Sequence, residues 1–421
     1  MTPRAWRAVV FGVTLWLTTL GLVGAALSGP ARPDPPPPGQ QVLVLLRLPP
    51  EHFRPDSAYS GSYGDGQGRG ARRRIASRLA RENGLTLVDD WPMPLVGVDC
   101  FIMTVAAGRS PTEVAQRLSR DPAVAWSEPM SVYHAQGGAP AAEGRLFRAQ
   151  PAAREWRLAD LHEIATGHDV LVAVIDSMIE ETHPDLLGQV RISEDFVPEH
   201  PVKAEQHGTG VAGIIAAKGV GIVGVAPRAR LMALRACWQT GPPTSQATTI
   251  CDSLSLAKAL HFAIEHNAQV INLSLSGPPD PLLGRLLDVA VARGAIVVGA
   301  YDRAAPDGGF PASHAGVVAV ADEALDAPPT GIYSAPGRDV PTTQPGGRWF
   351  LVNGSSYAAA HVSGLFAVLR ERAPHSRGSS ALVLARSGGG AIDTCATLLR
   401  ASWACDCACA HGFGNSAIVR R

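Results

Sequence analysis

Three side chains that are far apart in the sequence have the types needed for nucleophilic catalysis. Asp176 ends the apolar run VLVAVID, His207 begins HGTGVAGIIA, and Ser356 follows the run RWFLV within NGSSYAAAHVSG. A serine hydroxyl is a poor nucleophile until a base takes its proton and a third group orients that base. Alone, an aspartate can cap a turn and a serine can cap a helix. Together, at strand ends and helix starts, the three predict an Asp-His-Ser triad with Ser356 as nucleophile.

The segments that carry these residues predict an α/β fold. From residue 151 onward, apolar runs rich in Val and Ile alternate with helical patterns, which is typical of a mostly parallel sheet flanked by helices on both faces. In such sheets the ligand site lies at the carboxyl ends of the strands. The expected strands are 170–176, 230–237, 268–275, 294–301 and 316–322, and the expected helices are 208–217, 253–266 and 281–293.

A smaller α+β domain is expected at 41–135, ahead of the α/β domain at 151–421. Its patterns follow the order β-α-β-β-α-β, which is the split βαβ, or ferredoxin-like, arrangement. A loop is expected at 57–70 and a Gly/Ala-rich linker at 136–150. The expected strands are 41–48, 85–90, 99–106 and 124–134, and the expected helices are 71–83 and 111–122.

The beginning of the chain has the layout of an export segment. Arg4 and Arg7 precede twenty uncharged residues at 8–27, and a Pro-rich linker follows at 29–40. Residues 1–28 are therefore interpreted as a cleaved signal peptide, with an uncleaved N-terminal membrane anchor as the alternative. Either interpretation predicts a secreted or periplasmic protein, and contact with a membrane only if the segment is kept.

The charge balance argues against a nucleic-acid-binding protein, and the cysteine content agrees with export. Lys+Arg and Asp+Glu both number 37, which argues against nucleic acid as the main partner. The seven cysteines suit an oxidising compartment. Cys237 and Cys251 flank a polar loop and are expected to form a disulfide, and Cys100 is expected to be a buried thiol. Disulfides are favoured over a metal site for the remaining cysteines, Cys395, Cys405, Cys407 and Cys409.

A second arrangement of serine, acid and histidine is also open. Gly354 to Ala358 nearly matches the G-x-S-x-G elbow of α/β-hydrolases, and Asp393 and His411 follow in the order that such esterases use. However, the last glycine of the elbow is Ala358, and Cys-rich sequence fills much of the chain after Ser356. The order Asp, His, Ser is therefore the preferred reading.

Six motifs in this order resemble the subtilisin-like serine proteases (subtilases, peptidase S8). They are VAVIDS (172–177), HPDL (183–186), HGTGVAG (207–213), GVAP (224–227), VINLSLSG (270–277) and NGSSYAAAHVSG (353–364). The resemblance covers about 155–420. It implies that Ser356 is the nucleophile, His207 the general base and Asp176 the orienting acid, and that Ser355 stands where the family usually has Thr.

The resemblance also implies how polypeptide substrates and the first domain relate to the site. Members of the family commonly carry an N-terminal propeptide of the 41–135 type, which acts as an intramolecular inhibitor and is removed by self-cleavage, here between about 134 and 150. Substrate would bind as an added strand. The expected substrate-binding residues are Ser274, Leu275, Ser276, Gly277, Gly299, Ala300 and Tyr301.

Two departures from the family change the expectations. Asp302 stands where the family has the asparagine that donates a hydrogen bond to the oxyanion, and an ionised carboxylate cannot donate. Asp302 would donate if protonated, or the Ser356 N–H and helix start would serve alone in a slower enzyme, or the chain would be a silent binding protein. Tyr301 and Ser276 replace glycines of the main specificity pocket, which argues against a preference for large aromatic residues.

No cofactor is expected. Family members often bind calcium through the aspartate of HPDL, here Asp185, and an Asn-bearing loop. The loop at 216–224 has neither Asn nor Asp, so a calcium site is predicted to be absent or weak. The sequence thus predicts an exported serine endopeptidase made as a self-processing zymogen. The alternatives are a catalytically weak or silent subtilisin-like binding protein and, more remotely, an α/β-hydrolase esterase.

Overall fold

The structure is a computed structural model that describes residues 38–48, 63–135, 138–141, 146–241, 247–325, 329–375 and 381–402. These residues belong to one compact unit that begins at Pro37. Within these ranges no helix is long and apolar enough to cross a membrane. The expected signal peptide or anchor at 1–28 lies outside the described residues, as do Cys405, Cys407 and Cys409.

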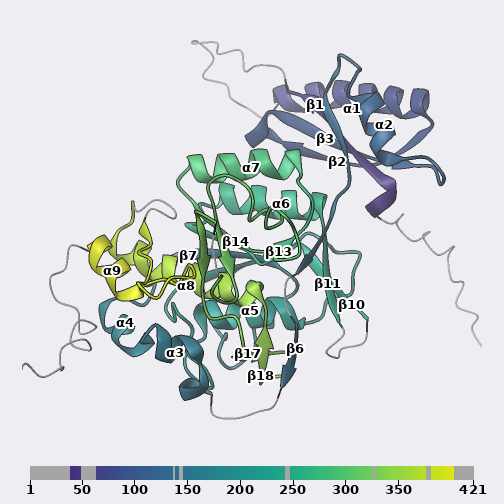
Figure 1. Ribbon diagram of the computed structural model, residues 1–421. Helices are drawn as coiled ribbons and strands as arrows, with labels where there is room; N and C mark the ends of the chain where they lie inside the picture. Colours follow the sequence, from purple (N-terminus) through teal and green to yellow (C-terminus); the bar gives the residue numbers. More distant parts are fainter. Residues whose placement is uncertain are drawn as a thin grey trace, which may run out of the picture. The chain divides into compact units, whose positions relative to one another are not determined.

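The α/β prediction is confirmed by a seven-stranded sheet whose neighbouring strands are all parallel (Figure 1). Its order is β16-β15-β14-β12-β7-β9-β8. The strands are β7 (Leu171–Asp176), β8 (Val190–Asp195), β9 (Arg230–Arg235), β12 (Val270–Leu273), β14 (Ile296–Ala300), β15 (Val317–Ala321) and β16 (Ile332–Ser334).

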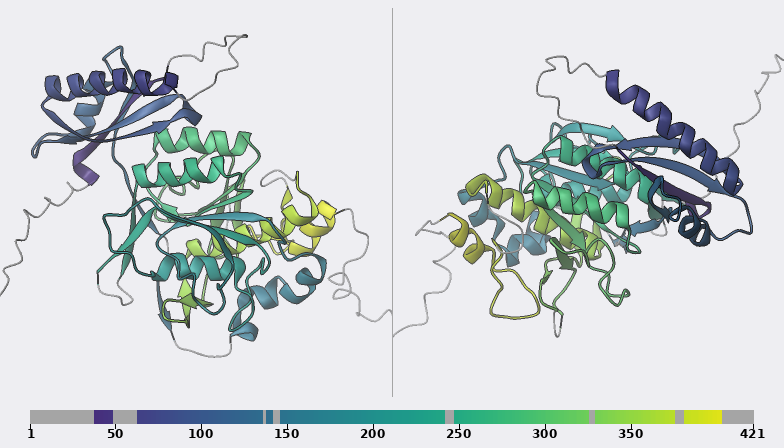
Figure 2. Two further views of the ribbon diagram at one scale, coloured as in Figure 1. Left: turned by 180° about the vertical axis from the view of Figure 1, so that it is seen from behind. Right: turned by 90° about the horizontal axis from the view of Figure 1, so that it is seen from above.

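Helices cover both faces of this sheet because successive strand residues point to opposite sides. On β7, Val172 and Val174 pack into one buried cluster, while Ala173 and Ile175 pack into another. The first cluster includes α5 (Gln206–Ala216) and α8 (Ser355–Arg372); the second includes α6 (Ser253–Glu265) and α7 (Pro281–Ala292). The left view in Figure 2 shows these two helix layers on either side of the strands. We call the sheet and its helices the large module.

Short helices complete the first of these clusters. The turn η3 (Phe147–Ala149) and the helices α3 (Pro151–Glu155) and α4 (Leu158–Ile164) precede β7, and α9 (Thr394–Ser402) packs beside α8. Buried side chains of α3, α4 and α9 join the apolar cluster that α5 and α8 form. The helix that carries Ser356 is therefore enclosed by protein on most sides.

A four-stranded antiparallel sheet precedes the large module and has the order β2-β3-β1-β4. Two helices pack on it in the predicted β-α-β-β-α-β sequence, and we call this part the N-terminal module. Its elements are η1 (Pro38–Gln40), β1 (Gln41–Arg47), α1 (Tyr63–Asn83), β2 (Leu85–Met93), η2 (Pro94–Val96), β3 (Val98–Val105), α2 (Pro111–Leu118) and β4 (Val124–Pro129).

Two predictions about this region were wrong in detail. The expected loop at 57–70 ends early, because α1 already begins at Tyr63. Ion pairs to distant strands, from Arg69 to Asp90 and from Arg72 to Asp99, hold that first part of the helix. The single strand expected at 124–134 is interrupted: β4 ends at Pro129, and Val132–Ala135 form a separate strand, β5, that leaves the N-terminal sheet.

Two small sheets receive the segment that follows the N-terminal module. In the order β10-β11-β5-β13, strand β5 lies between β11 (Thr248–Asp252) and β13 (Leu275–Ser276), with β10 (Cys237–Thr240) at the edge. In the order β17-β18-β6, strand β6 (Gly138–Ala141) pairs with β18 (Arg348–Asn353), which pairs with β17 (Val340–Gln344). Part of the region expected to be a linker, 136–150, is therefore a strand.

Candidate active site

Asp176 is the last residue of β7, at the carboxyl end of the parallel sheet, as predicted. Asp176 is only 2% exposed. Its carboxylate accepts hydrogen bonds from the Ser177 N–H at 2.6 Å and from His207 Nδ1. Ser177, which the sequence did not single out, also accepts a bond from the Gly208 N–H through its hydroxyl. These bonds fix the carboxylate in one orientation.

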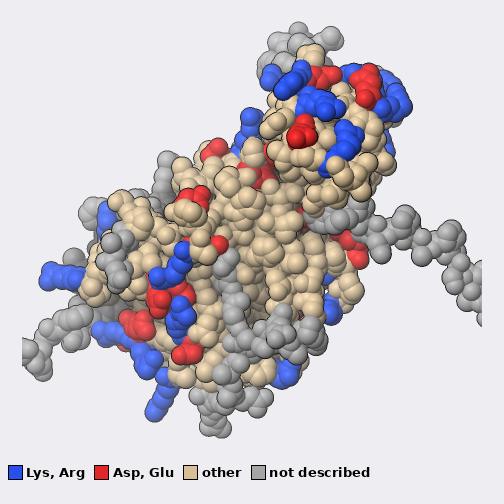
Figure 3. Space-filling model, turned by 45° about the vertical axis from the view of Figure 1, so that its right-hand side comes forward, with Lys and Arg blue, Asp and Glu red and all other residues tan. Residues whose placement is uncertain are grey.

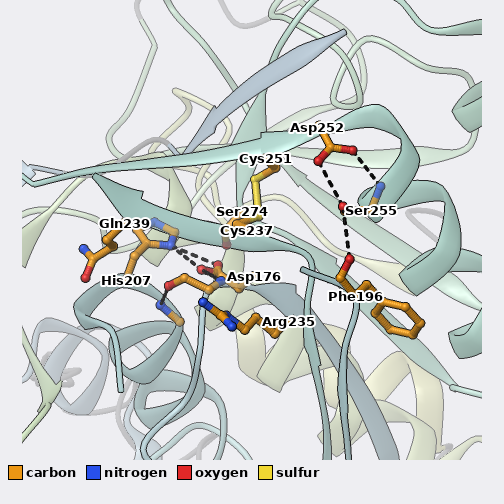
Figure 4. Close-up of a disulfide and its surroundings, with 12 residues drawn as sticks. Asp176, Phe196, His207, Arg235, Cys237, Gln239, Cys251, Asp252, Ser255 and Ser274 are labelled. Atoms are coloured by element: carbon orange, nitrogen blue, oxygen red, sulfur yellow. Dashed lines mark hydrogen bonds and ion pairs between the residues drawn. A yellow bond between two sulfur atoms is a disulfide. The ribbon is translucent and has the colours of Figure 1, made fainter. Parts of the chain in front are cut away.

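His207 lies in the first turn of α5, where its Nδ1 is 2.8 Å and 2.9 Å from the two carboxylate oxygens of Asp176 (Figure 4). The next residue must be glycine, because a Cβ on Gly208 would lie 2.2 Å from the Ser177 carbonyl oxygen. The other ring nitrogen, Nε2, is buried and has no hydrogen-bond partner among the described residues. A neutral imidazole with its proton on Nδ1 would leave Nε2 as an available base.

Ser356 is the second residue of α8, directly after β18, at the predicted strand-to-helix joint. Its hydroxyl donates to the Ser274 carbonyl oxygen at 2.9 Å, and its own carbonyl accepts from the Ser274 hydroxyl at 2.8 Å. The ring of His207 lies 5.5 Å from that of Tyr357, the residue after Ser356. The structure thus brings Asp176 and His207 into direct contact and places Tyr357, the neighbour of Ser356, beside the His207 ring, while the Ser356 hydroxyl is bonded to Ser274.

A buried tyrosine lies next to the site. Tyr357 is buried beside Asp176, and burial followed by the charge of Asp176 raises the pKa of its phenol far above the ordinary value. The phenol is therefore neutral at any pH at which a protein folds. The backbone N–H of Ser356 lies in the first turn of α8, where N–H groups lack partners within the helix and the helix dipole favours negative charge.

The predicted substrate-binding strand is already paired with a segment from the N-terminal side of the chain. Leu275 of β13 lies opposite Ala135 of β5, and Ser276 lies opposite His134, in antiparallel register. On its other edge β5 pairs with β11, where Tyr133 lies opposite Cys251. A strand inserted between two others in this way is the arrangement by which a sheet edge binds an extended peptide.

Asp302 directs its carboxylate toward neighbouring protein groups. One oxygen accepts from the Ser276 hydroxyl at 3.1 Å and the other from the Ala304 N–H at 2.8 Å. In both contacts the carboxylate accepts a hydrogen bond, which is what an ionised aspartate does. Ser276 also closes the space above Gly309, since a Cβ there would lie 2.1 Å from the Ser276 hydroxyl oxygen.

The remaining predicted substrate-binding residues line the same region. Gly277 forms a bridge with Phe310, and Gly299 and Ala300 are buried on β14, opposite Ala319 and Val320 of β15. Tyr301 follows at the carboxyl end of β14, half-buried, with its N–H donating to the Val320 carbonyl.

A disulfide joins two strands close to His207. Cys237 and Cys251 are bonded and lie opposite each other on β10 and β11, as predicted (Figure 4). The same hairpin holds the start of α5, because the side chain of Gln239 accepts from the Gln206 N–H. Cys100 is buried on β3, and burial raises the pKa of its thiol far above the ordinary value, in line with an inert core residue.

Glu205 is a buried neighbour of the site that was not predicted from the sequence. It precedes α5 and is 2% exposed. Its carboxylate accepts from the Met178 N–H and the Gln239 N–H, both at 2.9 Å or less, and lies 3.8 Å from Arg235. It therefore joins the loop after Asp176 to the helix that carries His207. In the sequence, the position of Glu205 two residues before His207 was the only indication that it lies near the site.

The residues around Asp185 do not fit a calcium ion. The Asp185 side chain is fully buried and accepts five N–H bonds, four from the backbone of Gly219 to Ile222 and one from the indole of Trp349 at 2.7 Å. Calcium requires several oxygen ligands, whereas this carboxylate is surrounded by donors. Among the described residues no cluster of His, Cys, Asp and Glu is placed to hold a metal.

The rival esterase arrangement finds no geometric support at its acid. Asp393 accepts from the Ala396 N–H at 2.8 Å and so belongs to the start of α9. His411 lies outside the described residues.

On the face drawn in Figure 3, basic and acidic side chains are intermixed, so that face carries no single-sign patch of the kind that binds nucleic acid.

The chain is similar to known proteins over most of this region. A family model described as "Subtilase family" matches residues 167–384. Subtilisin E of Bacillus subtilis is 33% identical over 65% of this chain and 72% of its own length, and subtilisin of Bacillus pumilus is 36% identical over 50% of this chain and 79% of its own. The structure of fervidolysin from Fervidobacterium pennivorans, described as a keratinolytic enzyme related to subtilisin, aligns with a TM-score of 0.63 at 20% identity, covering 85% of this chain and 60% of that one.

Proposed function

This chain belongs to the subtilase family and is a serine-type endopeptidase, and we propose that it works through Asp176, His207 and Ser356. The observation that supports this assignment is the pair of contacts between His207 Nδ1 and the Asp176 carboxylate. They hold the imidazole in the tautomer in which Nε2 can accept a proton. Nε2 of His207 is buried and has no hydrogen-bond partner among the described residues.

The proposed reaction needs one small movement. Rotation of the Ser356 side chain from the Ser274 carbonyl toward His207 would let Nε2 take the hydroxyl proton as Oγ attacks the peptide carbonyl. The same proton then passes to the leaving amine, and water hydrolyses the acyl-enzyme by the reverse route. Catalytic hydrogen bonds are often unformed before substrate is positioned, so the bond to Ser274 is compatible with this step.

We infer that the oxyanion is stabilised mainly by the Ser356 N–H at the start of α8. Asp302 is engaged as an acceptor with Ser276 and Ala304, so an ionised carboxylate there adds no donor. Loss of one such donor typically costs about 10²–10³ in turnover, and a slow enzyme is therefore expected. The same contacts favour a weak peptidase over a fast one.

We further propose that the N-terminal module is an inhibitory propeptide. Strand β5 fills the position between β11 and β13 that an extended substrate would take. Strand β6 pairs with β18, which leads directly to Ser356, since Gly138 lies opposite Asn353. The chain therefore approaches the nucleophile from one side and leaves it on the other, as an uncut substrate would.

This arrangement narrows the self-cleavage site to the bonds between Ala135 and Gly138. Only Gln136 and Gly137 separate β5 from β6 in the sequence. The register of β5 with β13 ends with Ala135 opposite Leu275, the residue after Ser274, and the Ser274 carbonyl holds the Ser356 hydroxyl. We therefore expect the mature chain to begin at Gly137.

The mass and N-terminal sequence of the product from the wild-type chain and from Ser356→Ala test these proposals together. We expect the wild type to lose residues up to 136 and to react with a fluorophosphonate probe, and Ser356→Ala to stay uncut and unlabelled. Export, as a secreted or periplasmic protein, predicts an additional cut near residue 28 in both; retention of 1–28 would instead indicate the anchor. Equal labelling of both proteins would contradict the role of Ser356.

A further inference from the structure

Two buried carboxyl groups meet where the N-terminal module contacts the large module. Glu128 lies on β4, and Asp280 is the N-cap residue of α7. Glu128 is 6% exposed and Asp280 is 4% exposed. They lie within hydrogen-bonding reach of each other, although no partner charge of opposite sign pairs with either one in the described hydrogen bonds and ion pairs.

Each carboxyl group has one oxygen that accepts a hydrogen bond of good geometry; the Leu282 N–H also faces both groups, and the Ser253 hydroxyl faces Asp280. The indole N–H of Trp126 donates to Glu128 Oε2 at 3.1 Å, and the Leu283 N–H donates to Asp280 Oδ1 at 2.9 Å. Glu128 Oε1 and Asp280 Oδ2 are buried without a hydrogen-bond partner in the part of the chain described. Two ionised carboxylates can only accept, so this contact requires a proton on one of them.

The nearby titratable groups do not supply a compensating positive charge. Burial raises the pKa of Glu128 to about 8, with the charge of Asp280 as the next cause, and burial raises the pKa of Asp280. The pKa values of Tyr133 and Cys100 are also raised by burial, so both stay neutral.

Two cations of the large module face the same interface but are directed elsewhere. Lys258 lies 4.5 Å from the ring of Trp91 and 3.7 Å from Asp89. The guanidinium of Arg285 lies 4.0 Å from the ring of Trp126. These contacts attach the modules through aromatic rings and leave the carboxyl pair to be neutralised by a proton.

We propose that Glu128 and Asp280 share one proton that fastens the N-terminal module to the large module, and that its loss at alkaline pH loosens this attachment. The inference rests on the proposed role of the N-terminal module as an inhibitory propeptide. It makes release of the inhibitor, after self-cleavage, faster at alkaline pH.

The direction follows from proton linkage. Glu128 has an ordinary pKa of 4.5 when the modules separate and about 8 when they are joined. Below pH 4.5 Glu128 is protonated in both states, and the shared proton makes its full contribution to the attachment of the N-terminal module. Between pH 4.5 and 8 the joined state holds one more proton than the separated state, so the equilibrium constant for attachment falls about tenfold per pH unit. Above pH 8 this constant falls little further.

The uncut precursor Ser356→Ala tests the proposal without relying on protease activity. Hydrogen exchange at the start of α7 and along β4, corrected for the intrinsic exchange rate, should show an opening constant that rises about 50-fold between pH 6 and pH 8. In Glu128→Gln the amide can donate to Asp280 without a proton, so the opening constant should be nearly independent of pH. Asp280→Asn, which keeps an N-cap, should behave in the same way.

A matched control and a direct signature complete the test. Glu113→Gln changes an exposed carboxylate of α2 and should keep the pH dependence of the parent. The infrared difference between the parent and Glu128→Gln at pH 7 should contain the band of a protonated carboxyl group. An unchanged pH dependence in both Glu128→Gln and Asp280→Asn, or no such band, would overturn the proposal. Either failure would leave the peptidase assignment intact, because every protein in the series lacks Ser356.

Discussion

The hydroxyl of Ser356 is bonded to the Ser274 carbonyl oxygen at 2.9 Å, and the Ser274 hydroxyl is bonded to the Ser356 carbonyl at 2.8 Å. This reciprocal pair joins the start of α8 to the residue just before β13, the strand proposed to receive substrate. In the proposed mechanism, Ser356 is thereby held beside the path of the substrate strand. Attack would then require its hydroxyl to exchange the Ser274 carbonyl for His207.

Asp176→Asn should lower kcat by about 10⁴-fold while the chain stays folded. The amide would stabilise the wrong imidazole tautomer and could not balance the imidazolium that forms during attack. Burst kinetics on a chromogenic peptide would measure the loss. Asp393→Asn is the matched control, because Asp393 accepts from the Ala396 N–H on α9; a larger loss in that variant would favour the hydrolase arrangement.

Asp302→Asn should raise kcat, by up to about 10²-fold, with little change in KM. An asparagine amide can donate to the oxyanion, whereas the carboxylate accepts from Ser276 and Ala304. Asp307→Asn is a suitable control, since Asp307 lies in the same loop and accepts from the Gly309 N–H. A fall in kcat on Asp302→Asn would mean instead that a protonated Asp302 is a working donor.

Peptide libraries should show little cleavage after Phe or Tyr. The Ser276 hydroxyl occupies the space next to Gly309 and is bonded to Asp302, which leaves little room for a large ring. Ser276→Gly should raise kcat/KM for a substrate with Phe before the cut bond by about tenfold or more. A wild-type profile dominated by aromatic residues would show that the pocket lies elsewhere.

Asp185→Asn should lower the free energy of unfolding by about 2–4 kcal/mol, because a buried carboxylate with five N–H donors loses its charge-assisted bonds. Millimolar calcium or a chelator should leave the melting temperature of the wild type unchanged. Asp288→Asn, an exposed site beside His314, serves as control. Marked protection by calcium would contradict the N–H-bonded interpretation.

Replacing Cys237 and Cys251 together by alanine should cost about 3 kcal/mol of stability, given the 14-residue separation of the bridge. Activity should fall as well, because Gln239 on the same hairpin holds the start of the helix of His207. Thermal unfolding of the wild type with and without a reductant would check the first effect; the reduced protein should match the variant.

Continuous apolar runs made the strands of the large module predictable from the sequence. Residues 172 to 175 alternate between the two cores, and both sides are apolar, so the run reads as a buried parallel strand. Asp176 and Ser356 were predictable for the same reason, since each breaks or follows such a run. Their chemistry then followed from residue type and order.

Other features depend on partners that are distant in the sequence. Residues 138–141 are Gly, Ala and Pro, with no strand pattern of their own, and become β6 only because β18 supplies the pairing edge. The departure of β5 from the N-terminal sheet likewise reflects two distant strands, β11 and β13. The hydrogen bonds around Asp185 could not be foreseen either, because backbone N–H groups leave no mark in a sequence.

Strand β6 has a consequence for the enzyme after its first turnover. If the chain is cut as proposed, β6 lies on the far side of the cut and stays covalently part of the mature chain when β5 is released. A foreign polypeptide would then have to displace these four residues before the part of it that follows the bond to be cut can bind next to β18. The new N-terminus of the enzyme would therefore compete with each substrate. Its dissociation from β18, rather than the chemical step, would limit the rate of the first cleavages.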